Sequence, residues 1–175
     1  MAERVIRAGA VIADEWTILG LAPEDTVAEP LPGGPIVVPL TYWKAHREAL
    51  HARGEAVGVW LKADDEPAEL AADAPSLALI AVHFPKFGDG RGYSTGTLLR
   101  TRLGYRGELR AFGEIGRDHL FGLKRCGFDS FRLPPHQDPE KALASLRDFS
   151  LTYQGAVDDP VPLFRKRLAG IGRLQ

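Results

Sequence analysis

The chain of 175 residues has a single cysteine, Cys126, and no long hydrophobic run near its start. One cysteine cannot form an internal disulfide, and it cannot by itself hold a zinc ion or an iron–sulfur cluster. The opening residues, MAERVIRAGAVIADEW, interrupt their short apolar pieces with Arg7, Asp14 and Glu15. This pattern differs from that of a signal peptide or a membrane span, so we expect a cytoplasmic protein without a membrane segment.

The familiar cofactor and metal motifs are also missing. The five histidines form neither an HExxH nor an HxH pattern, which gives no reason to expect a metal site. Glycines 88, 90 and 92 are spaced GxGxG, whereas the dinucleotide fingerprint is GxGxxG, and no GxxxxGK[ST] loop occurs. The usual modes of nicotinamide and ATP binding are therefore not expected, and the cofactor, if there is one, stays unknown.

Charge is nearly balanced overall, at −1, but it is unevenly distributed. Residues 1–82 carry 6 basic and 13 acidic side chains, whereas residues 83–132 carry 10 basic and 5 acidic ones. No nucleic-acid recognition module accompanies the basic block, so we do not expect a nucleic-acid partner. A small anionic ligand or an acidic protein surface is the partner that the charge pattern favours.

From residue 36 onward, short apolar runs alternate with helix-like segments, which is typical of βα units and a mainly parallel sheet. Strands are expected at residues 35–40, 56–61, 76–84, 107–112 and 128–133, with 150–155 as a further candidate. The pattern predicts an α/β fold with five or six strands. It leaves open whether they form an open twisted sheet or half of a (β/α)₈ barrel.

The predicted α/β domain spans residues 36–157. Residues 1–35 are expected to form a separate N-terminal segment, with a hairpin that turns near Asp14 followed by an acidic, proline-rich linker. Residues 158–175 are expected to form a C-terminal tail, because they are rich in proline at the start and basic at the end.

The stretch HFPKFGDGRGYS, residues 83–94, follows the most apolar run of the chain and precedes a helix that Ser94 would cap. Loops at the carboxyl ends of parallel strands are where α/β proteins bind ligands. The three glycines are expected to adopt positive φ and to bring backbone amides close to a ligand.

The polar side chains of this loop make it a candidate anion site. Lys86 and Arg91 would supply positive charge, Tyr93 and Ser94 would donate hydrogen bonds, and Asp89 is a candidate base. The structural alternative is a tight turn in which Asp89 and Arg91 pair at the surface.

A second polar cluster lies further along. Glu108 and Arg110 flank Leu109 on a predicted strand and so share one face, and Asp118 stands at the start of the next helix. Glu108 or Asp118 could act as a catalytic acid or base, and Arg110 could contact an anionic substrate. The alternative is that these charges form structural salt bridges.

Residues 84–131 resemble the DUF934 family of small bacterial proteins through FPKFGDGRGYS, GYRGELRAFG and RCGFD. Gly96, Glu114 and His119 depart from the residues usual in that family. The resemblance implies a role in sulfite reduction, within sulfur assimilation, beside sulfite reductase, and an association with oxidoreductases. It carries over no catalytic residue.

Three functions remain open at this point. The first is an accessory protein of assimilatory sulfite reduction that binds a small oxyanion (sulfite, sulfate or phosphate) or docks on the reductase through the basic 83–132 face. The second is an enzyme that acts on a small anionic metabolite held by the FPKFGDGRGYS loop. The third is a non-catalytic α/β interaction protein, and each of the three is compatible with a homodimer.

Overall fold

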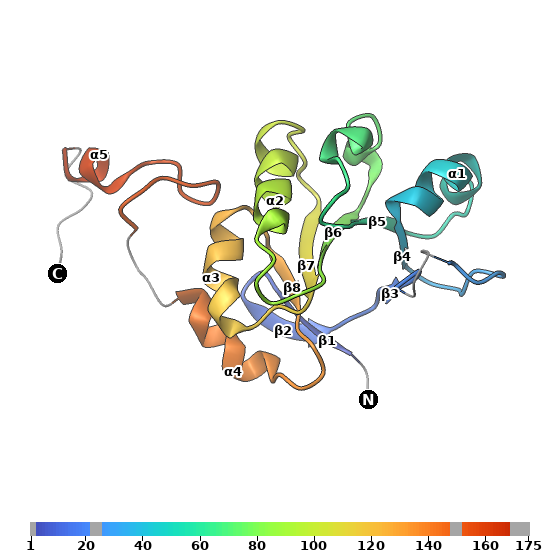
Figure 1. Cartoon of the computed structure of the whole chain (residues 1–175), viewed down its shortest axis with the longest axis horizontal. Coiled ribbons are helices and arrows are strands. Elements are labelled where there is room, and N and C mark those ends of the chain that lie inside the picture. The colour runs from blue at the N-terminus through green and yellow to red at the C-terminus, as the bar shows by residue number, and fades with distance from the viewer. Residues whose placement is uncertain (1–2, 22–25, 148–151, 169–175) are drawn as a thin grey trace.

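The computed structural model describes residues 3–21, 26–147 and 152–168 (Figure 1). The strands are β1 (Arg4–Arg7), β2 (Ala10–Ala13), β3 (Thr17–Ile18), β4 (Ile36–Pro39), β5 (Val57–Leu61), β6 (Leu79–Phe84), β7 (Glu108–Gly113) and β8 (Ser130–Arg132). The helices are α1 (Leu40–His51), α2 (Arg91–Thr101), α3 (Arg117–Arg125), α4 (Pro139–Leu143) and α5 (Leu163–Leu168). Short 3₁₀ turns occupy Pro67–Leu70, Ala74–Ser76 and Ala144–Arg147.

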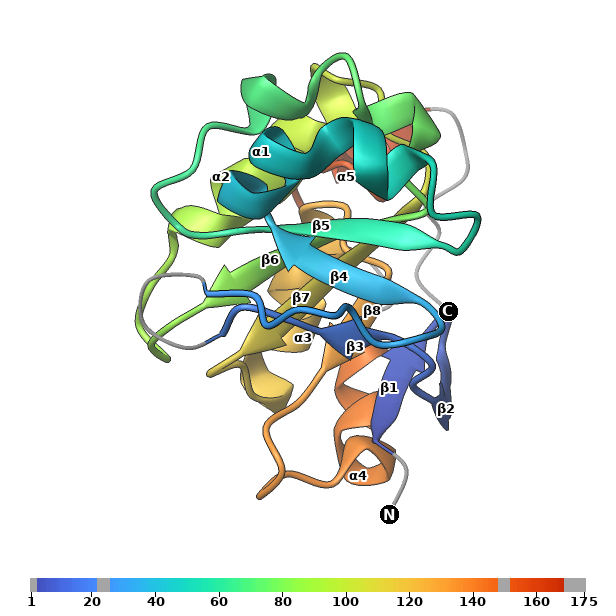
Figure 2. The same cartoon turned by 90° about the vertical axis from the view of Figure 1, so that its right-hand side faces the viewer.

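The strands form one sheet in the order β2-β1-β8-β7-β6-β5-β4-β3. Strands β3 to β8 are parallel and lie beside one another in chain order, whereas β1 pairs antiparallel with β2 and β8. Because every crossover has the same hand, the connecting helices cover one face, and the sheet curls into a half-barrel. Figure 2 shows α1 and α2 on one side of β4 and β5. The α/β prediction is confirmed, and the half-barrel is the architecture adopted.

The sheet has eight strands, and the predicted five or six was too few. The additional strands are β1, β2 and β3, which lie within the first 35 residues and join both edges of the sheet. The N-terminal hairpin turns at Ala8 and Gly9, both with positive φ, and not near Asp14 as expected. Residues 152–155 contain no strand, and residues 150 and 151 of that predicted strand lie outside the described residues.

The concave face of the half-barrel has its own small apolar cluster. It consists of Val37, Trp60, Leu79, Ala81 and Phe112, with Trp16 and Ile18 packed against it. The indole Nε1 of Trp60 donates to the carbonyl of Leu19 at 2.8 Å, which fastens the N-terminal segment across this face. The N-terminal segment therefore packs against the apolar cluster of the concave face. No helix in the described parts of the chain is both long and apolar enough to cross a bilayer.

In the glycine-rich loop, Gly92 has a packing role. None of glycines 88, 90 and 92 has positive φ, contrary to expectation. Helix α2 begins at Arg91 with Gly90 as its N-cap, four residues before the predicted cap Ser94. Gly92 is buried against the ring of Phe84, and a Cβ added to Gly92 would lie 2.4 Å from Phe84 Cζ. This glycine lets the first turn of α2 approach β6 closely.

We predict that Gly92→Ala lowers the free energy of unfolding by about 1–3 kcal/mol, because the buried Phe84 ring must move. Gly90→Ala is the matched control, since nothing lies within 4 Å of its Cβ position and its φ of −84° suits alanine. The control should change stability by less than about 1 kcal/mol. Urea denaturation measures both, and equal effects of the two substitutions would contradict the packing role.

Candidate functional site

Asp89 and Arg91 of the signature loop are paired with each other. Arg91 Nε donates to Asp89 Oδ1 at 2.9 Å, Nη2 donates to Oδ2 at 2.6 Å, and Nη1 also contacts the carboxylate of Asp64. The hydrogen bonds from Arg91 lower the pKa of Asp89 to about 2. Both charges are therefore already engaged at the surface, which is the arrangement that the turn interpretation anticipates.

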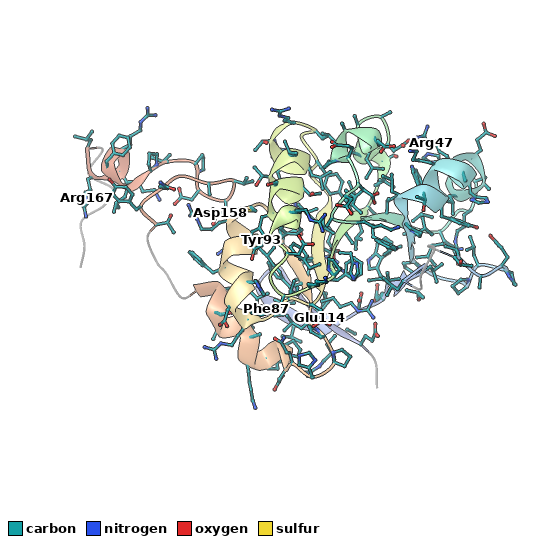
Figure 3. All side chains as sticks on the ribbon, in the orientation of Figure 1. Arg47, Phe87, Tyr93, Glu114, Asp158 and Arg167 are labelled. Atoms are coloured by element: carbon teal, nitrogen blue, oxygen red, sulfur yellow. The ribbon has the colours of Figure 1, made fainter. Side chains whose placement is uncertain are left out.

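The other predicted loop and helix residues do not converge with this pair. Lys86 and Ser94 are exposed, and the Asp118 side chain is 77% exposed beside Arg117. Tyr93 is half-buried, with its ring 5.8 Å from that of Phe84 in an edge-on contact. Burial raises the pKa of the Tyr93 hydroxyl. Figure 3 shows Tyr93 between α2 and α3, where the side chain helps to join the two helices.

Glu108 and Arg110 share the concave face, as their spacing predicts, and they belong to a buried ion network. Arg110 is 1% exposed, and its Nη1 donates to both oxygens of Asp14, at 2.8 and 2.9 Å. Its Nη2 donates to Glu108 Oε1 at 2.8 Å, and its Nε donates to Ser130 Oγ at 3.2 Å. Arg7 pairs with the other oxygen of Glu108 at 3.1 Å. These contacts link β1, β7 and β8 to the segment that follows β2.

Replacing Asp14 tests how much this buried ion network contributes to the stability of the fold. We predict that Asp14→Ala lowers the free energy of unfolding by about 3–5 kcal/mol, because Arg110 loses two charge-assisted hydrogen bonds in a buried position. Asp118→Ala removes a solvent-exposed carboxylate and should change stability by no more than about 0.5 kcal/mol. Chemical denaturation followed by circular dichroism compares them, and a loss under about 1 kcal/mol for Asp14→Ala would refute the structural role.

A pocket of about 230 Å³ opens at the carboxyl ends of β6, β7 and β8. Its wall consists of Leu21, His83, Phe112, Gly113, Glu114, Arg132 and residues 133–135. This is the edge at which parallel α/β sheets bind ligands. We call it the carboxyl-edge pocket.

His83 is the central polar group of the carboxyl-edge pocket. Its ring stacks on Phe112 at 4.9 Å and meets Trp60 edge-on at 5.8 Å. Burial lowers the pKa of His83, and the nearby carboxylate of Glu114 opposes that effect. Within the described parts of the chain, no hydrogen bond to the imidazole nitrogens is formed. The ring is therefore a neutral group at pH 7 that can exchange a proton or a hydrogen bond with a ligand.

Gly113 brings the end of β7 against this histidine. Its φ is +103°, and a Cβ there would lie 2.4 Å from the carbonyl oxygen of Phe84 and 3.1 Å from Nε2 of His83. The next residue, Glu114, is exposed at the rim and donates its backbone N–H to the Phe84 carbonyl at 2.8 Å. A side chain at position 113 would therefore push the rim away from His83.

Arg132 connects the carboxyl-edge pocket to the buried ion network. Its side chain is 21% exposed, pairs with Glu3 and lies 4.0 Å from Asp14 through Nε. The pocket thus contains one cation that is partly neutralised by two carboxylates. Among the residues that the structure describes, no group of three or more His, Cys, Asp or Glu side chains is placed to hold a metal ion.

The carboxyl-edge pocket lies at the edge of the sheet where the sequence predicts a ligand site, but His83, Glu114 and Arg132 are not among the predicted site residues. A signal for His83 does exist. It is the only polar residue in LALIAVHF, and the alternation of a strand puts it on the face of Leu79 and Ala81. A lone histidine near the end of an otherwise buried strand is the pattern to look for.

We predict that NMR titration of the His83 ring gives a midpoint below 6.5, and that Glu114→Gln lowers it further by removing the opposing carboxylate. Because the unfolded chain binds this proton more readily, the free energy of unfolding should fall as the pH drops from 6.5 toward the folded-state pKa. His83→Gln should flatten this pH dependence. A midpoint at or above 6.5 would show that the ring is not desolvated as described.

These features define a half-barrel α/β protein with a ligand-sized pocket at the carboxyl edge of its sheet. The chain belongs to the family described as "Bacterial protein of unknown function (DUF934)", whose sequence model matches residues 58–164, more than half of the chain. The family membership expected from the signature motifs is therefore confirmed. No curated protein matches the chain. The matched region includes His83, Glu114 and Arg132, but it does not include Asp14.

Proposed function

We propose that this protein binds a small polar metabolite in the carboxyl-edge pocket and serves as an accessory protein of assimilatory sulfite reduction. The observation that carries the binding proposal is the half-buried His83 ring, which lines the carboxyl-edge pocket together with Glu114 and Arg132. The link to sulfite reduction rests on the resemblance of residues 84–131 to the DUF934 family.

The pocket wall favours a small organic molecule. Phe112, Leu133 and two prolines provide apolar contact, whereas His83, Glu114 and Arg132 provide a few polar groups, a combination typical of ligand sites. A volume of about 230 Å³ limits the ligand to a small molecule. The ligand that fits has an apolar body and a group that donates a hydrogen bond to the neutral imidazole.

A small oxyanion, such as sulfite, sulfate or phosphate, is the second ligand class. Arg132 favours it, because a guanidinium in a pocket wall binds oxyanions in bidentate geometry. The carboxylates of Glu114 and Glu3 oppose it by repulsion. Because attraction by Arg132 and repulsion by the two glutamates oppose each other, we expect an oxyanion to bind less tightly than an uncharged or zwitterionic ligand.

If the protein is an enzyme, His83 is its best proton acceptor. Asp89 and Glu108, the bases that the sequence suggested, are held by Arg91 and Arg110. The neutral His83 ring can take a proton from a bound ligand, and the adjacent Glu114 would stabilise the imidazolium that forms.

The test compares ligand binding in three variants. Thermal shift and calorimetry with sulfite, sulfate, phosphate and a set of small amino and hydroxy acids should reveal at least one ligand of the intact protein. His83→Gln should weaken its binding at least about tenfold through loss of a buried hydrogen bond. His46→Gln, on the exposed face of α1, should have no effect.

Arg91→Ala completes the comparison. Loss of binding in Arg91→Ala with full binding in His83→Gln would place the site in the signature loop and would overturn the assignment to the carboxyl-edge pocket.

A further inference from the structure

Residues 152–168 form a segment that extends from the α/β body beyond α3 (Figure 1). We call it the C-terminal segment. Arg125, the last residue of α3, holds its base: Nη1 donates to Thr152 Oγ1 at 2.6 Å and pairs with Asp158 at 3.5 Å. The backbone N–H of Val157 donates to the Arg125 carbonyl at 3.0 Å. The segment is thus anchored at one point and extends away from there.

Large apolar side chains are concentrated on this segment. Of the seven large hydrophobic residues that are exposed in the described chain, four lie here: Tyr153 (74%), Val161 (45%), Phe164 (53%) and Leu168 (85%). Phe164 and Leu168 lie four residues apart on α5, which is the spacing of one helix face, and Val161 lies two residues before that helix. No residue of α5 is buried. Exposed apolar side chains gathered in this way mark an interaction surface.

In the C-terminal segment the two aspartates are paired within the chain, whereas two arginines are exposed. Asp158 and Asp159 face the chain's own cations, Arg125 and Lys166 respectively. Arg165 and Arg167 are exposed on α5. Figure 3 shows Asp158 toward the body and Arg167 at the far end of the segment. The surface offered to a partner is therefore apolar and cationic.

We propose that α5 and the residues leading into it dock in an apolar groove rimmed by carboxylates on another protein. A helix that inserts the apolar side chains of one face into a groove is a recurrent mode of recognition, and complementary charge sets its orientation. The inference rests on the proposed accessory function, under which the groove belongs to the sulfite reductase. A second copy of this chain fits poorly, because Lys or Arg side chains accompany the carboxylate in three of its own surface pockets, and a fourth, beside Trp43, has the single carboxylate of Glu55.

The experiment measures binding of the full-length protein to purified assimilatory sulfite reductase from the same organism, by biolayer interferometry at two salt concentrations. Phe164→Ser/Leu168→Ser should weaken binding at least about tenfold by removing the apolar anchors. Arg165→Glu/Arg167→Glu should weaken it by a similar factor, with the larger loss at low salt, where charge is less screened. Lys44→Glu/Lys141→Glu makes the same change of charge at exposed positions outside both the C-terminal segment and the basic 83–132 face, and it should bind as the wild type does.

The outcomes separate the two proposals. Equal binding by all variants overturns the docking inference and leaves the accessory function standing. No binding by the wild-type protein contradicts the accessory function. If the segment variants instead lose binding to phosphatidylglycerol vesicles, or lower the mass seen by analytical ultracentrifugation, the occupant is a lipid surface or a second copy, and the inference is wrong.

Discussion

The buried guanidinium of Arg110 is the constraint on which the concave side of this half-barrel depends. Arg110 lies on β7 and donates hydrogen bonds to Asp14, which is 96 residues earlier in the chain. It also donates to Glu108 and Ser130. A buried charge of this kind is stable only when its donors are satisfied, so the N-terminal segment must follow one path across the sheet. That path carries Trp16 and Ile18 over the apolar cluster and brings Leu21 to the wall of the carboxyl-edge pocket.

The pocket is a consequence of the same arrangement. Arg132 lies on β8 between the ion network and the cavity, since it is 4.0 Å from Asp14 and also lines the wall beside His83. Rigid neighbours on both sides desolvate the imidazole, which lowers its pKa, while the rim carboxylate of Glu114 remains in solvent. Scaffold and site therefore share residues, and a substitution in the ion network should also change the pocket.

Much of the fold follows from the sequence, because the alternation of apolar runs and helix-like segments from residue 36 onward is a local signal. Gly104 and Gly127, which follow α2 and α3, both have positive φ, as is typical of glycines that end helices. The first 35 residues were harder, because β1 joins the sheet through β8, more than 120 residues later, and β3 consists of only two residues. The signature loop was ambiguous for a similar reason: Arg91 is held partly by Asp64, 27 residues away, a pairing that no spacing rule reveals. The edge of the sheet where the pocket lies and the position of His83 on its strand both follow from local patterns, whereas the contribution of Leu21 to the pocket wall depends on the path of the N-terminal segment.

The central claim is that the ligand site lies at His83 and not in the glycine-rich loop beside it. A map of amide and histidine-ring chemical shifts, recorded on the full chain during titration with a ligand found by thermal shift, tests this most directly. The account predicts that the largest changes fall on His83, Glu114 and Leu133, with small changes at residues 86–94. The largest changes at Lys86, Arg91 and Ser94, with an unmoved His83 ring, would contradict it.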